Sequence, residues 1–116
     1  VMISSVATDS MGPGFGLYAL SKAAMEAMAF TLAKEERDND IRVNIVAPGL
    51  VDTDMGKALL VSLTGSDDVD MRDRDASSPF GYVCTPADIA ATVAHLVSED
   101  GRYITNQKIR VNGGGF

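Results

Sequence analysis

The sequence predicts an α/β fold in which helices cover a doubly wound parallel sheet. Three segments rich in β-branched or alternating apolar residues read as strands, and helical patterns separate them, which is typical of parallel sheets. The chain has 116 residues, of which 46% are hydrophobic, and a formal net charge of −6. These values fit one globular domain, so residues 1–116 are expected to form a single unit.

The first half of the chain predicts two strands joined by a long helix. Residues 1–6 are expected to form a buried strand, followed by the Gly/Pro loop TDSMGPGFG. The next pattern predicts a helix from Phe15 to Arg37. Residues 41–47, IRVNIVA, are rich in β-branched side chains and predict the second strand, which the pair Pro48 and Gly49 ends.

The second half predicts an irregular segment and then a well-capped helix. Residues 55–82 include the charged run SDDVDMRDRD and are expected to form one or two short helices in a mobile excursion. In TPADIAATVAHLVSED, Thr85 suits the N-cap, Pro86 the first helical position and Asp88 the position three residues after the cap. The apolar stripe of this helix is expected to consist of Ile89, Val93, Leu96 and Val97.

Both ends of the chain read as strands. QKIRVN predicts the last strand, with Lys108 and Arg110 on a wetter face than Ile109 and Val111. VMISSVA begins in a strand-like run without an initiator Met, as though the chain were entered halfway through a sheet. We therefore expect the chain to be a fragment of a longer protein.

Composition argues against several classes of function. The ten Lys and Arg residues are scattered, which argues against a nucleic-acid surface, and no apolar run approaches the length of a membrane span. Cys84 is the only cysteine and His95 the only histidine, so we expect no disulfide framework, no zinc cluster and a reducing, cytoplasmic setting. The aspartates of residues 67–75 lack the ligand spacing of a calcium loop, and no bound metal is expected.

The helix expected from Phe15 to Arg37 is apolar nearly all round, with few polar positions before Lys34. Such a helix has to be covered on more than one side. The sheet supplies one cover, and the small alanine side chains permit a second helix to approach closely. This pattern favours a homo-oligomer that pairs through this helix, and the alternative is burial by a missing part of a larger chain.

Tyr18 and Lys22 lie one helical turn apart and can point toward one spot. A free tyrosine has a pKa of about 10, and a neighbouring ammonium group favours its ionised form. The pair could therefore move protons near neutral pH. An isolated pair with this spacing is more often a core aromatic residue beside a surface lysine, and other motifs are needed to choose between these two interpretations.

Five motifs supply that context. In order they are ISS, YALSK, NIVAPGLVDTDM, TPADIAATVAHLVSED and YITNQKIRVNGG. Their order and spacing resemble the C-terminal half of the short-chain dehydrogenase/reductase family, a single Rossmann-like domain, and the residues around Thr53 look most like members similar to 3-oxoacyl-carrier-protein reductases. The resemblance implies that this chain holds the last three strands of that sheet and the catalytic half of the domain.

The resemblance also implies catalytic roles for three side chains. Tyr18 would be the general acid/base for a ketone or secondary alcohol, and Lys22 would assist it and bind the nicotinamide ribose. Ser5, thirteen residues before Tyr18, would hold the substrate oxygen in preference to Ser4. A structural Ser5 at the strand end is the alternative if Tyr18 is also structural.

The resemblance implies cofactor contacts after the second strand. Pro48 and Gly49 would turn the chain there, and Val51 and Thr53 would contact the nicotinamide carboxamide, although Thr53 also suits a helix N-cap. Residues 55–82 resemble the family's substrate loop. Its candidates for contact with an apolar substrate, which could equally be ordinary packing residues, are Leu59, Leu60, Met71 and Phe80.

Neither GPGFG nor GGG forms a dinucleotide-binding fingerprint, because neither has the required glycine spacing between a strand and a helix. The resemblance places the phosphate loop, the residue that chooses NAD or NADP, and a relay asparagine before Val1. The predicted function is therefore an oxidoreductase that uses NAD or NADP. Two alternatives remain: a catalytically inactive scaffold or regulatory binder, and a fragment that is inactive by itself.

Overall fold

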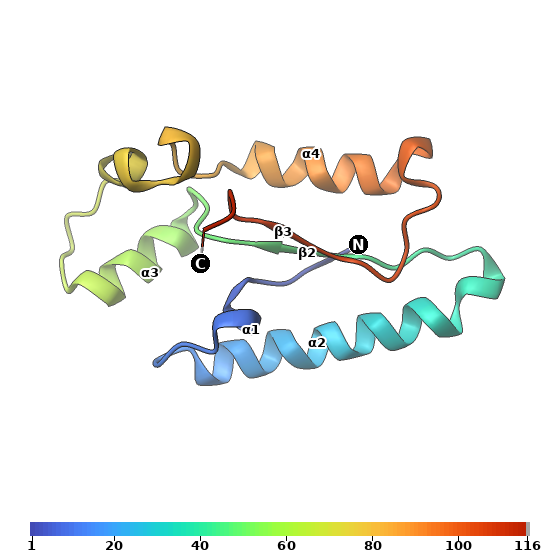
Figure 1. The fold of residues 1–116 in the computed structure, drawn as a ribbon. Coiled ribbons are helices and arrows are strands. Elements are labelled where there is room, and N and C mark those ends of the chain that lie inside the picture. Colours follow the sequence, from blue (N-terminus) through green and yellow to red (C-terminus); the bar gives the residue numbers. More distant parts are fainter. Residues whose placement is uncertain (116) are drawn as a thin grey trace.

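The computed structural model describes residues 1–115 as three layers, with a parallel three-stranded sheet between helices (Figure 1). The strand order is β1–β2–β3, with α4 on one face of the sheet and α2 on the other. In chain order the elements are β1 (Met2–Ile3), α1 (Ala7–Ser10), α2 (Gly16–Glu35), the 3₁₀ helix η1 (Arg37–Asn39), β2 (Ile45–Pro48), α3 (Asp54–Thr64), the 3₁₀ helices η2 (Met71–Ser77) and η3 (Pro79–Gly81), α4 (Pro86–Val97), the 3₁₀ helix η4 (Glu99–Gly101) and β3 (Lys108–Val111).

The central strand, β2, lies between two parallel partners. Ile45 pairs with Met2 of β1 on one side and with Lys108 of β3 on the other. The strand is buried because helices cover both faces of the sheet, as expected for a parallel sheet. It begins four residues later than predicted, since Val43 and Asn44 bond instead to the turn before β3, at Thr105 and Ile104.

The first strand is shorter and more exposed than predicted. Only Met2–Ile3 forms β1, although the amide of Ser4 still donates to the Val46 carbonyl over 2.7 Å. Among the described residues β1 has a neighbouring strand on one side only, and 44% of Ile3 is exposed. The prediction of a buried strand was therefore wrong for Ile3. The predicted loop after it contains the single helical turn α1.

The long helix α2 agrees closely with its predicted limits. Ala29 and Ala33 pack against Val43 and Ile45 to form the core between this helix and the sheet. The opposite side of α2 is exposed within this chain and includes large apolar side chains. These are Leu17, Leu20 and Met28.

The capping box predicted for α4 is confirmed. Thr85 accepts a hydrogen bond from the Asp88 amide, and the Asp88 carboxylate accepts one from the Thr85 amide over 2.8 Å. The Thr85 hydroxyl also donates to the Asp88 carboxylate over 2.7 Å, and this bond, followed by that of the Thr85 amide, holds the pKa of Asp88 below its ordinary value. Leu96 is fully buried, whereas Val97 is 62% exposed, so its place in the apolar stripe was wrong. Val97 is the last residue of the helix and points away from the sheet.

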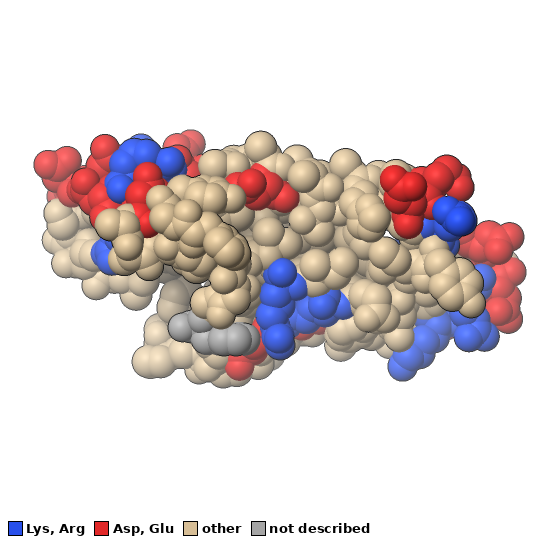
Figure 2. Space-filling model, turned by 45° about the horizontal axis from the view of Figure 1, so that its top comes forward, with Lys and Arg blue, Asp and Glu red and all other residues tan. Residues whose placement is uncertain are grey.

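The segment predicted to hold one or two short helices contains α3, η2 and η3. Leu60, Met71 and Val83 form a second core cluster that anchors it. Figure 2 shows charged side chains at both ends of one face and a group of Lys and Arg side chains near its middle. Within the charged run, Arg72 of η2 lies 2.6 Å from Asp52. Across residues 1–115 no three His, Cys, Asp or Glu side chains are grouped to hold a metal. No helix in that range is long and apolar enough to cross a membrane.

Ion pairs connect the last strand, β3, to the short helix α1. Asn106 enters β3 with φ of 60°, the left-handed conformation that asparagine tolerates. Lys108 lies 2.7 Å from Asp9 of α1, and Arg110 lies 2.7 Å from the other oxygen of the same carboxylate. The Arg110 side chain is 48% exposed and that of Lys108 only 14%, so the wetter face is confirmed at Arg110 and was wrong at Lys108.

We predict that Gly56→Ala destabilises the protein by about 1–3 kcal/mol, the usual cost of overpacking. A Cβ at Gly56 would overlap the Val51 carbonyl oxygen and lie 3.2 Å from Met71, and backbone cannot move aside cheaply. Urea unfolding measures the change. Gly16→Ala is the matched control, because no atom lies within 4 Å of its Cβ position and its effect should be small. Equal stabilities for the two variants would contradict the prediction.

We predict that the Asp9→Asn variant loses less stability on acidification than the parent protein does. The Arg110 hydrogen bond lowers the pKa of Asp9, partial burial opposes this, and Lys108 lowers the pKa further. The carboxylate therefore stabilises the fold above its unfolded pKa of about 4, and this contribution disappears as pH falls through the lower folded value. Thermal unfolding midpoints from about pH 6 to pH 3 should fall less steeply for Asp9→Asn than for the parent.

The exposed residue Asp40, in the turn after η1, offers a control for this titration. Asp40→Asn should leave the acid slope of the unfolding midpoint close to that of the parent. Parallel curves for the parent and Asp9→Asn would show that the ion pairs of α1 contribute nothing to acid stability.

Candidate active site

A cleft of about 820 Å³ opens at the carboxyl edge of the sheet. It is built from the ends of β1 and β2, the first turns of α2, and α3, which all meet at this edge (Figure 1). All seven residues predicted as catalytic or cofactor-binding line this one cleft. They are Ser5, Tyr18, Lys22, Pro48, Gly49, Val51 and Thr53.

The two adjacent serines after β1 have different surroundings. Ser4 is 3% exposed, and its hydroxyl donates to Glu26 of α2 over 2.5 Å. Ser5 is half-buried, and its hydroxyl oxygen accepts a hydrogen bond from the Ala7 amide over 3.1 Å. The Ser5 hydroxyl keeps its own proton for donation, so Ser5 is better placed than Ser4 to bind a substrate oxygen.

Tyr18 and Lys22 occupy successive turns at the start of α2. Tyr18 is 38% exposed, and the Lys22 ammonium lies 5.8 Å from the centre of its ring, within the range of a cation–π contact. Lys22 also donates to the Ile3 carbonyl over 3.0 Å. An ammonium group has three donors, so this bond fixes its position while leaving capacity to bind hydroxyl groups of a ligand.

The segment after β2 is held beside the cleft by the end of β3 and by the residue Cys84 before α4. The Gly49 amide donates to the Val111 carbonyl over 3.1 Å, and Val51 forms an isolated parallel bridge with Cys84. The Thr53 hydroxyl accepts from the Gly56 amide over 3.1 Å and therefore caps α3, the structural role predicted for it. Thr53 also lines the cleft, so capping and ligand contact are compatible at this position.

Apolar side chains line the rest of the cleft, but they are only partly those predicted. Leu59 lines it together with Phe15 and Met55, which were not singled out. The predicted contacts Leu60 and Met71 are buried in the core between α3 and η2, because they lie on the inner side of that segment. They cannot contact a substrate in this arrangement.

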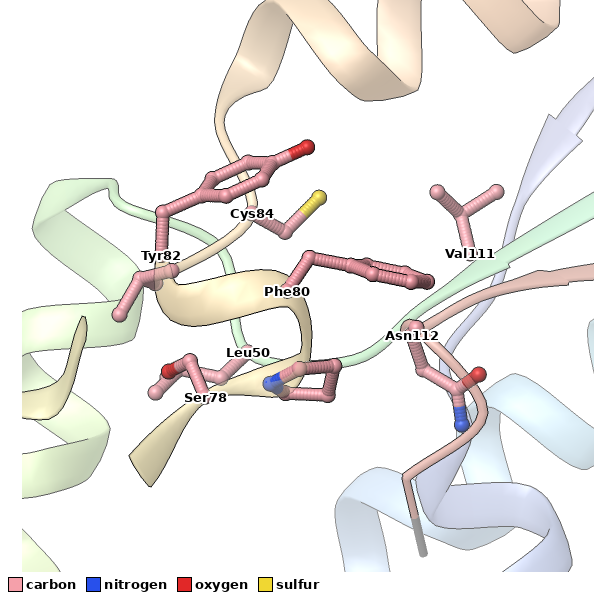
Figure 3. A pocket seen from close by; sticks show the side chains of 10 residues that line it. Leu50, Ser78, Phe80, Tyr82, Cys84, Val111 and Asn112 are labelled. Carbon is pink, nitrogen blue, oxygen red and sulfur yellow. The ribbon is translucent and has the colours of Figure 1, made fainter. Parts of the chain in front are cut away.

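Phe80, the fourth predicted substrate contact, lies elsewhere. It is 83% exposed, has a left-handed φ of 61°, and lines a separate pocket of about 170 Å³ beside the end of β3 (Figure 3). Cys84 lines the same pocket, and burial, assisted by the charge of Asp88, raises the pKa of its thiol. A thiol with a raised pKa is a poor nucleophile at neutral pH.

Sequence reasoning missed Glu26, which is buried beneath the Ser5 turn. It lies two helical turns after Tyr18 and one after Lys22, so the three form one stripe along α2. A carboxylate among the alanine and methionine residues of that helix was the available signal. Its partners could not be identified, because Lys108 is 82 residues away in the chain.

Comparison with known proteins identifies the relatives of this chain. The family profile described as Enoyl-(Acyl carrier protein) reductase matches residues 1–115. The chain is 39% identical to an NADPH-dependent aldehyde reductase-like protein, chloroplastic, of Arabidopsis thaliana over 114 residues, 98% of this chain and 40% of that protein. It is also 39% identical to a 3-oxoacyl-[acyl-carrier-protein] reductase of Chlamydia muridarum, covering 98% of this chain and 43% of that one.

A solved structure shows the same fold. The crystal structure of a short chain dehydrogenase family protein from Francisella tularensis superposes with a TM-score of 0.81 and 28% identity, over 97% of this chain and 49% of that one. The chain thus spans 40% and 43% of the lengths of the two curated relatives named above. Its sheet and helices match part of their Rossmann-like domain, and the chain belongs to the short-chain dehydrogenase/reductase family.

Proposed function

We propose that this chain is the catalytic half of an oxidoreductase that uses NAD or NADP to interconvert a ketone and a secondary alcohol. The observation that carries the proposal is the single cleft shared by Ser5, Tyr18, Lys22 and the segment from Pro48 to Thr53. Since the chain spans less than half of its relatives, we propose that it acts as the C-terminal half of a longer polypeptide. The experiments below use that full-length polypeptide.

The groups that line the cleft fit a nicotinamide nucleoside. The Lys22 ammonium supplies donors for ribose hydroxyls, while the backbone of Val51 and the Thr53 hydroxyl offer donors and acceptors for a carboxamide. When bound, the nicotinamide supplies or accepts the hydride. The protein's task is to orient the reactants and to manage the proton.

Three side chains divide that task. In reduction, Tyr18 Oη gives its proton to the substrate oxygen; in oxidation, it takes the proton from the hydroxyl. Ser5 donates a hydrogen bond to the same oxygen and so stabilises the charge that develops on it. Lys22 holds a positive charge beside the tyrosine ring, anchored by the Ile3 carbonyl. Leu59 and Met55 favour a substrate with an apolar portion.

We predict that Tyr18→Phe lowers kcat for carbonyl reduction by about 10²-fold or more, because the proton donor is lost while the ring remains. Nicotinamide absorbance against a panel of ketones measures the rate, and dinucleotide binding measured by calorimetry should persist. Tyr103→Phe is the matched control, since Tyr103 is 99% exposed and does not line the cleft.

A near-normal rate for Tyr18→Phe would defeat the proton-transfer role. A folded, dinucleotide-bound parent that reduces or oxidises nothing in the panel would instead favour an inactive scaffold or regulatory binder. The cytoplasmic setting stays a prediction from the sequence, and the Arabidopsis relative is named as chloroplastic.

We further propose that two copies pair through the exposed side of α2. Leu17 is 86% exposed, Leu20 66% and Met28 55%, and this row is apolar along a helix whose other side packs on the sheet. Exposed apolar patches of this kind mark protein interfaces. A second copy satisfies the requirement for cover on both sides of α2.

Met28→Glu should lower the molar mass of the full-length protein in solution to that of a smaller assembly, because it places a charge in the apolar row. Light scattering after size-exclusion chromatography measures the mass, and Tyr103→Glu, which adds the same charge away from α2, should leave it unchanged. An unaltered mass for both variants would rule out pairing through this side of the helix.

A further inference from the structure

A buried polar cluster lies directly beneath the Ser5 turn. It consists of Ser4, Thr8, Glu26 and Lys108, which we call the Glu26 cluster. One carboxylate oxygen of Glu26 accepts the Ser4 hydroxyl over 2.5 Å and lies 2.9 Å from the Thr8 hydroxyl. The Lys108 ammonium lies 3.0 Å from the same oxygen and 2.7 Å from Thr8. Glu26 is only 8% exposed.

Stability alone does not explain such a cluster. Taking a carboxylate and an ammonium group out of water is costly, and apolar side chains of similar size often replace buried ion pairs without loss of stability. What a fully bonded polar cluster adds is fixed geometry, because each partner accepts only a narrow range of positions. The Glu26 cluster therefore suggests a group nearby whose position matters.

That group is Ser5. The Glu26 cluster holds the residue before it, through the Ser4 hydroxyl, and the Thr8 hydroxyl lies 2.8 Å from the carbonyl oxygen of Ser5 itself. Ser4 is held against Glu26, and the hydroxyl of Ser5, the next residue, accepts from the Ala7 amide. Both serines border the cleft, but only the Ser5 hydroxyl keeps its proton free of Glu26.

The same helix carries the reacting partner of Ser5. Along α2, Tyr18 lines the cleft, Lys22 bonds to the Ile3 carbonyl and Glu26 bonds to the Ser4 hydroxyl. Two successive turns of α2 thus bond to two successive residues at the end of β1, Lys22 to Ile3 and Glu26 to Ser4. We propose that Glu26, acting through Ser4, is a positioning residue that fixes Ser5 relative to Tyr18, an inference that rests on the proposed function.

The first test is Ser4→Ala in the full-length protein. It removes one hydroxyl from a residue that takes no part in proton transfer, and it frees the strand end from Glu26. Misplacement of a reacting group by a fraction of an ångström costs rate, so kcat should fall about tenfold, while the dissociation constant of the dinucleotide stays within about twofold. Ser77→Ala is the control, because it also removes one hydroxyl, but from an exposed residue of η2 that bonds to the Arg74 carbonyl and does not line the cleft, so kcat should be unchanged.

The second test asks whether Ser4 acts through Ser5. Ser4→Ala is combined with Ser5→Ala, and kcat of the double variant is compared with that of Ser5→Ala alone. If the Glu26 cluster serves to place the Ser5 hydroxyl, Ser4→Ala should have no further effect in a protein that already lacks this hydroxyl. The kcat values of Ser5→Ala and of the double variant should then be equal within about twofold. A full tenfold penalty in the Ser5→Ala background, or no penalty in the parent, overturns the proposal.

A third variant separates the hydrogen bond from the charge. In Glu26→Gln combined with Lys108→Gln, both charges are removed, but the introduced amide oxygen at position 26 can still accept the Ser4 hydroxyl. This double variant should lose less kcat than Ser4→Ala does. A larger loss would assign the effect to the ion pair and contradict positioning through Ser4.

Nuclear magnetic resonance, which does not depend on turnover, tests the positioning role of Glu26 separately from the proposed function. In Ser4→Ala the backbone amide resonances of Ser5 and Ala7 should shift or broaden, because Ala7 donates to the Ser5 hydroxyl, whereas Ser77→Ala should leave both signals in place. A parent protein without activity would defeat the proposed function alone. Unchanged Ser5 and Ala7 signals in Ser4→Ala would defeat the positioning role.

Discussion

The close packing of α2 on the sheet through small side chains is the constraint on which the site depends. Ala29 and Ala33 let the helix axis approach β2, where Val43 and Ile45 complete the contact. A helix held this closely cannot rotate or slide without disrupting the packing of the interior. Its first turns therefore lie at a fixed place beside the carboxyl edge of the sheet, and Tyr18 and Lys22 are carried there as part of a rigid element rather than on a loop.

The sheet fixes the other half of the site by the same kind of constraint. In parallel strands all carboxyl ends meet at one edge, and ligands of open α/β sheets bind outside that edge. Ser5 follows β1 and Pro48 ends β2, and both line the same cleft. The first residues of the two strands, Met2 and Ile45, pair with each other although 42 residues lie between them in the chain. The chemistry is assembled by topology, and side-chain contacts such as that of Lys22 with Ile3 only refine it.

Much of this arrangement could be predicted because it depends on local patterns and on the order of motifs. The capping box of Thr85 and Asp88 and the limits of α2 are both set by residues within one or two turns. Predictions failed where a distant neighbour decides burial. Ile3 is exposed because, among residues 1–115, its strand has a neighbouring strand on one side only, and Met71 is buried because the segment after α3 packs against Leu60.

The ion pairs that hold α1 have a consequence for how the site is completed during folding. Asp9 and Arg110 are 101 residues apart, and Thr8 and Lys108 are 100 apart, so these contacts close the largest loops in the described chain. Contacts with such separation form late, because their loop entropy must be overcome before they contribute. On a ribosome, the turn around Ser5 is synthesised about a hundred residues before Lys108 and Arg110 and reaches its final position only after β3 has followed it. Premature termination before Lys108 therefore leaves the residues that line the cleft present in the chain yet unassembled.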